Sequence, residues 1–315
     1  MDSSISTVEL EEKAKLLPSS LRQLLIKLDT ERIKTMEELR LREGQSLSFV
    51  AAGREWTPLE WDNHRITKKE IAWVLEAAGH GSIHAVLEQF KHGFLAVEGG
   101  HRIGICGSVA MKQGEMINFR SISSLAIRFC HEVPAIGVPV LPQLMERGKL
   151  LNTLIFSPPG GGKTTLLRDL IRCVSDGVGM ESLRVGVADE RGELCGMYQG
   201  KAQRNVGRQT DIIDGCPKAQ ALLMILRGMN PQVLAADEIT AAEDLQAIEE
   251  IAGCGVTLLA TAHGAAPEDV HLRPIYRELL QKEIFRRFVW ITIEHGNRKY
   301  HVLRKEEMGA LCCIS

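Results

Sequence analysis

The chain has 315 residues, of which 44% are hydrophobic and 25% charged, and its formal net charge is −2. This composition is that of a globular protein and excludes an intrinsically disordered chain. No apolar run approaches the roughly 20 residues of a membrane-spanning helix, and the small net charge gives no general basic character, so we expect neither a transmembrane segment nor a nucleic-acid partner.

The first residues and the cysteines indicate a cytoplasmic protein. Residues 1–6 contain no basic region followed by an apolar core, so no secretory signal is expected. The eight cysteines are scattered, without C-x-x-C or a zinc-binding spacing. They are therefore predicted to be free thiols in a reducing compartment.

The N-terminal region begins with helical and strand patterns. A helix is predicted over 8–29, with a break near its proline, and two strands are predicted over 37–42 and 47–50. Thr67, with a glutamate three positions later, is typical of a capping box that starts a helix. A further helix is predicted to begin at Ser82.

A β-rich stretch follows. Residues 94–97 and 102–107 are predicted to form a hairpin around the Gly-Gly turn, and 117–120 and 124–129 to extend the sheet or its connecting helix. Several prolines and a helix-like segment at 143–148 mark the end of this region. We predict an α+β domain over residues 1–147 and a second domain over residues 148–315.

The strongest motif lies between the apolar run 150–156 and the helical pattern 166–172. Strand, glycine loop, Gly-Lys-Thr and helix are typical of a P-loop, or Walker A motif. Its N–H groups and helix N-terminus bind phosphate, its lysine reaches the β- and γ-phosphates, and its first threonine helps to hold Mg²⁺. A serine stands where the motif usually has its first glycine. The predicted ATP-binding residues are Ser157, Pro158, Pro159, Gly160, Gly161, Gly162, Lys163, Thr164 and Thr165.

Two acidic strand ends follow the P-loop. The apolar run 232–236, followed by Asp237 and Glu238, is the Walker B pattern. We expect Asp237, with Thr164, to hold Mg²⁺, and Glu238 to activate the attacking water. Glu190 follows another buried-strand pattern and is a second candidate for the base. The sequence leaves the choice between the two glutamates open.

The remaining patterns complete a parallel α/β domain. The buried strand 256–260 leads into Thr261 and His263, whose side chains are placed to sense a γ-phosphate. Residues 200–217 are predicted to form a polar loop. Helices are predicted over 219–227 and 242–252, and a terminal hairpin over 285–303. Strands alternating with helices and a final hairpin predict a RecA-like P-loop core with an added β element.

The motifs, taken in their order along the chain, resemble those of a known protein family. Gly162-Lys163-Thr164, 189–191, 237–238 and 261–264 occur in the order of the Walker A, Asp, Walker B and His boxes of type II and type IV secretion ATPases. More closely, the chain resembles the stage III sporulation AA family over about residues 35–305. This closer resemblance rests on the sequence segments 99–104, 123–128, 189–193 and 211–219.

The resemblance implies a cytosolic ATPase that works as a homo-hexameric ring. Such a ring would dock on a membrane-embedded, secretion-like channel between the mother cell and forespore of an endospore-forming bacterium. ATP hydrolysis would power assembly of the channel or transport through it. In such rings, arginines of the N-terminal domain complete the nucleotide site. The catalytic residues so implied are Lys163, Glu190, Arg191, Glu238, His263, Arg102, Arg120 and Arg128.

Two other functions are weighed against the ATPase. A nucleotide-binding scaffold with little hydrolysis is favoured by the serine at position 157. A RecA-like nucleic-acid motor is possible for this fold, but the net charge of −2 and a single short aromatic-basic stretch at 285–288 argue against it.

Overall fold

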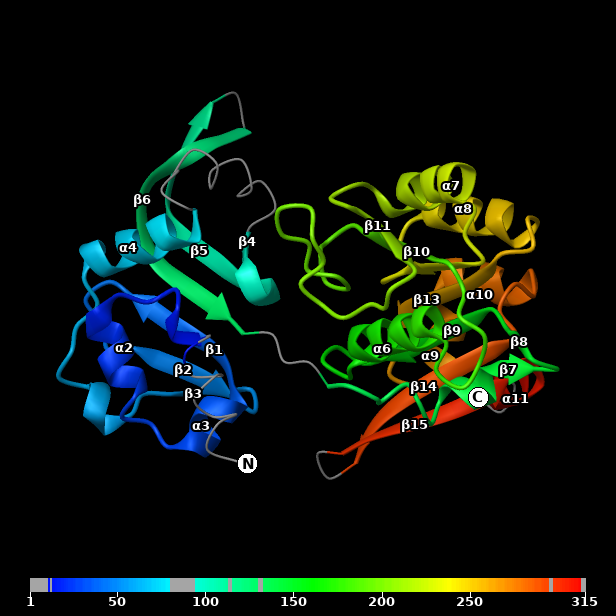
Figure 1. Cartoon of the computed structure of the whole chain (residues 1–315), viewed down its shortest axis with the longest axis horizontal. Helices are drawn as coiled ribbons and strands as arrows, with labels where there is room; N and C mark the ends of the chain where they lie inside the picture. The colour runs from blue at the N-terminus through cyan, green and yellow to red at the C-terminus, as the bar shows by residue number, and fades with distance from the viewer. Residues whose placement is uncertain are drawn as a thin grey trace. The chain divides into compact units, whose positions relative to one another are not determined.

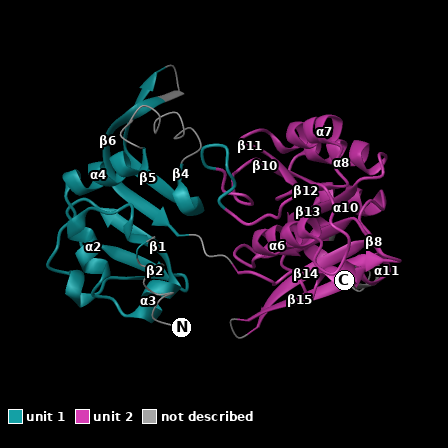
Figure 2. Cartoon of the chain, in the orientation of Figure 1, with its two compact units in different colours: residues 1–131, 198–203 teal, residues 132–197, 204–315 magenta. Residues whose placement is uncertain are grey.

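The computed structural model describes residues 11, 13–79, 94–112, 115–129, 133–294 and 297–312 (Figure 1). The chain separates into two units (Figure 2). Unit 1 contains residues 1–131 and 198–203, and unit 2 contains residues 132–197 and 204–315. Segment 198–203 thus belongs with unit 1, although it is inserted within the sequence of unit 2. The division at residue 147 stays a prediction, and each unit is described by itself.

Unit 1 is built on a six-stranded sheet in the order β3-β2-β1-β6-β5-β4, in which every neighbouring pair is antiparallel. The predicted strands and the Gly-Gly hairpin are confirmed, with Val97 opposite His101. The stretches predicted at 117–120 and 124–129 form one long strand. The bounds are β1 (Met36–Arg42), β2 (Ser48–Ala51), β3 (Arg54–Trp56), β4 (Phe94–Val97), β5 (His101–Lys112) and β6 (Glu115–Arg128).

Three described helices, α2 (Ser19–Leu25), α3 (Thr30–Thr35) and α4 (Lys68–Ala78), accompany this sheet. The capping box that starts α4 is confirmed, because the Glu70 backbone N–H donates to Thr67 and the Glu70 carboxylate accepts from the Thr67 backbone. The helix predicted after Ser82 lies outside the described residues. The helices cover an apolar core of their own, so unit 1 has the anatomy of a domain.

Unit 2 contains a seven-stranded sheet in the order β11-β10-β12-β13-β9-β14-β15. All neighbouring pairs are parallel except the last, the antiparallel pair β14 and β15. The predicted α/β core and terminal hairpin are therefore confirmed. The bounds are β9 (Thr153–Ser157), β10 (Val185–Asp189), β11 (Thr210–Asp214), β12 (Val233–Ala236), β13 (Thr257–His263), β14 (Arg287–Glu294) and β15 (Asn297–Arg304).

The central strands are buried on both faces. Every residue of β9, β10 and β12 is buried, as expected for parallel strands that are covered by helices on both sides. The carboxyl ends of parallel strands meet at one edge of a sheet, where open α/β sheets bind their ligands. The helices of this unit are α6 (Lys163–Asp176), α7 (Lys218–Met229), α8 (Ala242–Ala252), α9 (Pro267–Leu272), α10 (Pro274–Gln281) and α11 (Lys305–Cys312).

One helical prediction is wrong. Residues 143–148 are not helical, because a 3₁₀ turn, Leu141–Leu144, leads into a short hairpin of β7 (Met145–Glu146) and β8 (Lys149–Leu150). At its turn, Arg147 and Gly148 have φ of 50° and 77°. Two consecutive left-handed residues give the backbone twist that a two-residue hairpin requires.

The segment predicted as a polar loop, 200–217, contains a strand. Residues Thr210–Asp214 form β11, which pairs in parallel with β10 at the edge of the sheet. An edge strand that is only partly buried has no long apolar run, so its sequence resembles a loop.

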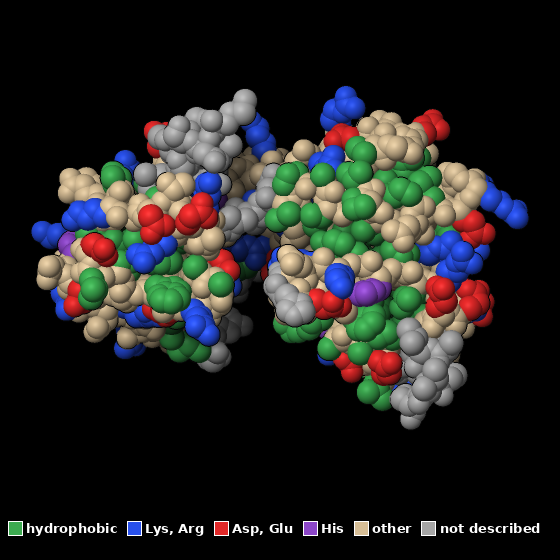
Figure 3. All heavy atoms as spheres, turned by 90° about the horizontal axis from the view of Figure 1, so that it is seen from below, with side chains coloured by type: hydrophobic (Ala, Val, Ile, Leu, Met, Phe, Trp, Pro, Cys, Tyr) green, Lys and Arg blue, Asp and Glu red, His purple; other side chains and the backbone are tan. Residues whose placement is uncertain are grey.

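Two features of the structure concern membrane-spanning segments and surface charge. Among the described residues no helix is both long enough and apolar enough to cross a membrane. On the face seen from below, Lys and Arg side chains are interspersed with Asp and Glu on both units (Figure 3).

Candidate functional site

The glycine loop joins β9 to α6. Gly160 and Gly162 have φ of 74° and 98°, a left-handed conformation that favours glycine. Gly162 is the N-cap of α6, and the Gly161 N–H donates to the Pro158 carbonyl at 3.0 Å, which closes a turn before the helix. The first N–H groups of a helix have no acceptor within it, so this loop presents an anion-binding end at the edge of the sheet.

Ser157, at the position usually taken by glycine, is fully buried at the end of β9, where it pairs with His263. Its backbone is not left-handed, so the position does not require glycine. The Ser157 hydroxyl donates to the Pro158 carbonyl at 2.9 Å. A Cβ placed on Gly161 would lie 2.6 Å from Ser157 Cβ and closer still to Oγ. The serine thus occupies space that the absence of a Gly161 side chain leaves open.

The predicted Mg²⁺ residues lie together. The Thr164 hydroxyl, in the first turn of α6, donates to Asp237 Oδ2 at 2.8 Å, and the Thr261 hydroxyl, on β13, donates to the other Asp237 oxygen. Burial raises the pKa of Asp237, while both hydroxyl bonds oppose this. A buried carboxylate beside a hydroxyl is an oxygen pair that a cation would stabilise.

Four of the five predicted catalytic residues of unit 2, all except Glu190, form a connected chain of contacts. Lys163 Nζ lies 3.4 Å from His263 Nδ1, and His263 Nε2 contacts Glu238 Oε1. The other Glu238 oxygen accepts from Arg191 at 2.9 Å. Four residues from four segments therefore meet at the carboxyl edge of the sheet. Both carboxylate oxygens of Glu238 are engaged.

The surroundings of His263 favour its neutral form. Burial lowers its pKa from 6.5, and the Lys163 ammonium lowers it further, while the Glu238 carboxylate opposes the shift. A neutral imidazole whose Nδ1 accepts a hydrogen bond from Lys163 carries its proton on Nε2, where it donates a hydrogen bond to Glu238. The His263 backbone N–H is fixed by the Tyr276 hydroxyl at 3.2 Å.

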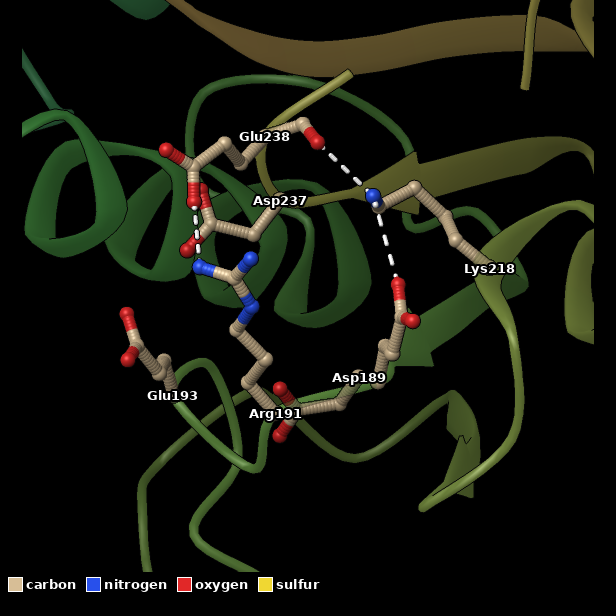
Figure 4. A pocket seen from close by; sticks show the side chains of 7 residues that line it. Asp189, Arg191, Glu193, Lys218, Asp237 and Glu238 are labelled. Carbon is tan, nitrogen blue, oxygen red and sulfur yellow. Dashed lines mark hydrogen bonds and ion pairs between the residues drawn. The ribbon is translucent and has the colours of Figure 1, made fainter. Parts of the chain in front are cut away.

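The backbone of Glu238 is also held from two sides. Its φ is 57°, which is uncommon for a residue with a side chain. Its N–H donates to the Thr261 hydroxyl at 2.7 Å, and its carbonyl accepts from Lys218 Nζ at 2.7 Å (Figure 4). These bonds stabilise a conformation that costs about 1–3 kcal/mol by itself.

The two acids at the end of β10 differ in their surroundings. Asp189 is buried and accepts from the backbone N–H groups of Leu194 and Cys195 at 3.1 and 2.8 Å, so it fixes the following loop. Glu190 is 43% exposed and forms an ion pair with Lys218 at 3.5 Å. The pocket beside them is lined by Asp189, Glu190, Arg191, Glu193, Lys218, Asp237 and Glu238 (Figure 4).

The three arginines predicted to complete the site lie on strands of unit 1. The Arg102 guanidinium stands 4.6 Å from the centre of the Phe94 ring, and Arg128 pairs with Glu38 at 3.0 Å. Arg120 is exposed on β6. Arg102 and Arg128 are opposite one another in the pairing of β5 and β6. Their part in a nucleotide site stays a prediction.

Sequence reasoning missed two cations at this site. Arg298 Nε, from the terminal hairpin, donates to the Gly161 carbonyl at 3.1 Å. Lys218, at the start of α7, is only 6% exposed and also pairs with Asp244 at 3.4 Å. Lys218 has one local signal, since a lysine directly after Pro217 opens a mostly apolar helix. Arg298 lies near the start of β15 among other charged and polar residues and has no such signal.

Comparison with known proteins identifies the family. A model of the family described as sporulation stage III, protein AA, matches residues 8–307. The chain belongs to this family. Stage III sporulation protein AA of Bacillus subtilis (strain 168) is 33% identical over 288 residues, which cover 91% of this chain and 92% of that protein. The resemblance predicted from the sequence is thereby confirmed.

Solved structures show the same fold. The ATPase DotB of Legionella pneumophila has a TM-score of 0.59 at 14% identity and covers 93% of this chain and 82% of its own. The pilus retraction motor PilT, solved with bound ADP, has a TM-score of 0.60 at 13% identity, covering 89% of this chain and 84% of its own. The predicted RecA-like P-loop fold of secretion ATPases is confirmed.

Proposed function

We propose that this chain is an ATP hydrolase that acts in endospore formation. The observation that carries the proposal is the meeting of Lys163, His263 and Glu238 beside the Thr164–Asp237 pair. Phosphoryl transfer needs positioning and charge neutralisation more than covalent help from the protein, and these residues supply both. Family membership and a fold shared with ATPases support the same conclusion.

Each residue has a defined part in this proposal. The glycine loop and Lys163 bind the phosphates of ATP, and Glu238 orients the attacking water and accepts its proton. Neutral His263 donates to Glu238 and keeps it directed toward Lys163. We favour Glu238 over Glu190 as the base, because Glu238 is less exposed and belongs to the chain of contacts that includes Lys163.

The oxygen pair of Thr164 and Asp237 fits Mg²⁺. Among the described residues no group of three or more His, Cys, Asp or Glu gathers around a possible metal. This suits Mg²⁺, which is usually held by one or two protein oxygens together with substrate phosphates and water. When bound, the ion would neutralise charge that develops on the transferred phosphoryl group.

We also propose an oligomeric state and a membrane partner for this ATPase. The family resemblance supports a homo-hexameric ring in the mother-cell cytoplasm, docked on a membrane-embedded, secretion-like channel whose assembly or transport it powers. Because both oxygens of Glu238 are engaged, we expect slow hydrolysis by the isolated chain. Arg102, Arg120 and Arg128 would then act across domains or subunits, so hydrolysis should rise with protein concentration.

The test compares ATP hydrolysis by the wild type, Lys163→Ala and the control Lys149→Ala over a range of protein concentrations. Lys149 is exposed on β8, outside the site. We expect Lys163→Ala to abolish hydrolysis and Lys149→Ala to leave it unchanged. Hydrolysis that survives Lys163→Ala would exclude the P-loop from the mechanism. Tight ATP binding without turnover at any concentration would favour the scaffold instead.

A further inference from the structure

Lys218 links the two acidic strand ends of the site. Its ammonium lies 2.7 Å from the Glu238 carbonyl, 3.5 Å from Glu190 Oε2 and 3.4 Å from Asp244 Oδ2. These partners belong to the loop after β12, the end of β10 and the first turn of α8. With its side chain only 6% exposed, Lys218 is a buried charge at which three segments meet.

A purely structural explanation accounts for only part of this arrangement. Asp244 already accepts from the Thr240 and Ala241 backbone N–H groups at 3.0 and 3.1 Å, so the start of α8 is capped independently of the lysine. Burying an ammonium group is costly, and ion pairs in protein interiors are often no more stabilising than apolar side chains. Among the described contacts, the Glu238 carbonyl accepts a hydrogen bond from Lys218 alone.

That carbonyl belongs to the residue with the unusual backbone. A φ of 57° at Glu238 turns the chain directly after the strand, and the Thr261 hydroxyl holds its N–H while Lys218 holds its carbonyl. With both ends of the residue fixed, one oxygen of its side chain contacts His263. The other oxygen is directed to Arg191 (Figure 4). The same ammonium pairs with the Glu190 carboxylate on the opposite side of the pocket.

We infer that Lys218 is a positioning residue for hydrolysis: it holds Glu238 in its left-handed conformation and pairs with Glu190, so that Glu238 alone is presented to the attacking water. This inference rests on the proposed ATPase activity and adds a residue to it. Lys218 touches neither the loop glycines nor the Thr164–Asp237 pair in any described contact. Its loss should therefore act on turnover and leave nucleotide binding nearly unchanged.

The experiment uses Lys218→Met, which keeps an unbranched side chain one atom shorter and removes its charge. The matched control is Arg227→Met, because Arg227 also lies on α7 and pairs with Glu250 of α8, at 3.2 Å, without contacting Glu238. We expect kcat to fall about 100-fold in Lys218→Met, as a displaced catalytic group can cause, while the ATP dissociation constant changes less than about threefold. Arg227→Met should match the wild type.

Hydrogen exchange gives a second readout that does not depend on hydrolysis. Amides in residues 237–241 should exchange faster in Lys218→Met and at the wild-type rate in Arg227→Met. Unchanged exchange there, or an unchanged kcat in an enzyme that depends on Lys163, would overturn the inference. If the wild type shows no Lys163-dependent hydrolysis, the proposed ATPase function is wrong. Amide hydrogen exchange in residues 237–241 then still tests whether Lys218 holds the Glu238 backbone. Lys218→Gln replaces Lys218→Met if the latter does not fold.

Discussion

Gly161→Ala is expected to disrupt phosphate binding because of the serine at position 157. An alanine Cβ at position 161 would lie 2.6 Å from Ser157 Cβ and 3.0 Å from the Pro158 carbonyl oxygen. Carbon atoms in contact prefer about 3.5–4.0 Å, so the loop must move by about 1 Å. Overpacking of this kind costs about 1–3 kcal/mol, which corresponds to a loss of nucleotide affinity of about five- to 150-fold.

Adding Ser157→Gly to Gly161→Ala should restore much of the lost nucleotide affinity. It removes the two atoms nearest to the new Cβ and leaves the Pro158 oxygen at 3.0 Å. The single change Ser157→Gly loses a buried hydroxyl bond and places a glycine in a strand, at a cost of about 0.5–1.5 kcal/mol. The two substitutions should therefore show a favourable coupling of at least about 1 kcal/mol, within the range found for residues in contact.

The assay is calorimetric titration of ADP with Mg²⁺ into the wild type, both single variants and the double variant. Gly228→Ala is the control, because nothing lies within 4 Å of its Cβ position on α7. Gly228→Ala should bind as the wild type does. Equal losses of affinity from Gly161→Ala with serine or glycine at position 157 would refute the steric explanation.

Three further predictions concern stability and reactivity. The hydrogen bond from Arg42 lowers the pKa of Glu55 from 4.5 to about 2, so this pair should stabilise the fold above pH 4.5 and lose that contribution between about pH 4.5 and 2. Because Glu55 is 40% exposed, we expect only ~0.2–1 kcal/mol, measured as a smaller acid-induced loss of stability in Glu55→Gln. Burial raises the pKa of the Cys195 thiol, so iodoacetamide should modify exposed Cys254 and leave Cys195 unmodified until the protein is unfolded, as mass spectrometry would show. Asp169→Ala should destabilise unit 2 by ~3 kcal/mol in urea unfolding, because its buried carboxylate accepts from two backbone N–H groups and pairs with an arginine.

Each of these predictions has an outcome that contradicts it. The first fails if Glu55→Gln and the wild type lose stability in parallel from pH 5 to pH 2. Modification of Cys195 at the rate of Cys254 in the folded protein would show that the thiol is not protected. For Asp169, the exposed Asp211→Ala serves as control, and equal effects of the two substitutions would remove any special role of the buried carboxylate.

The sequence determined which residues gather at the candidate site because its motifs are local. Each motif is encoded by a short contiguous segment: the glycine loop, the helix that follows it, and the strands that end in acidic residues. The physical rules of parallel sheets then bring those strand ends to one edge. The meeting of Lys163, Thr164, Asp237, Glu238 and His263 at one edge could therefore be predicted from the chain alone. So could most helices and strands of this unit, though not β11 or the hairpin of β7 and β8.

The tertiary structure decided what depends on contacts between distant segments. The space that Ser157 occupies is set by Gly161, and the backbone of Glu238 is held by Lys218 from another helix. Strand β11 forms because its backbone pairs with the edge of β10. Its own residues lack the apolar pattern that would predict a buried strand. No local pattern encodes such pairings, since each partner looks ordinary in its own segment. Sequence thus determines which groups are available, and packing determines which of them hold one another in place.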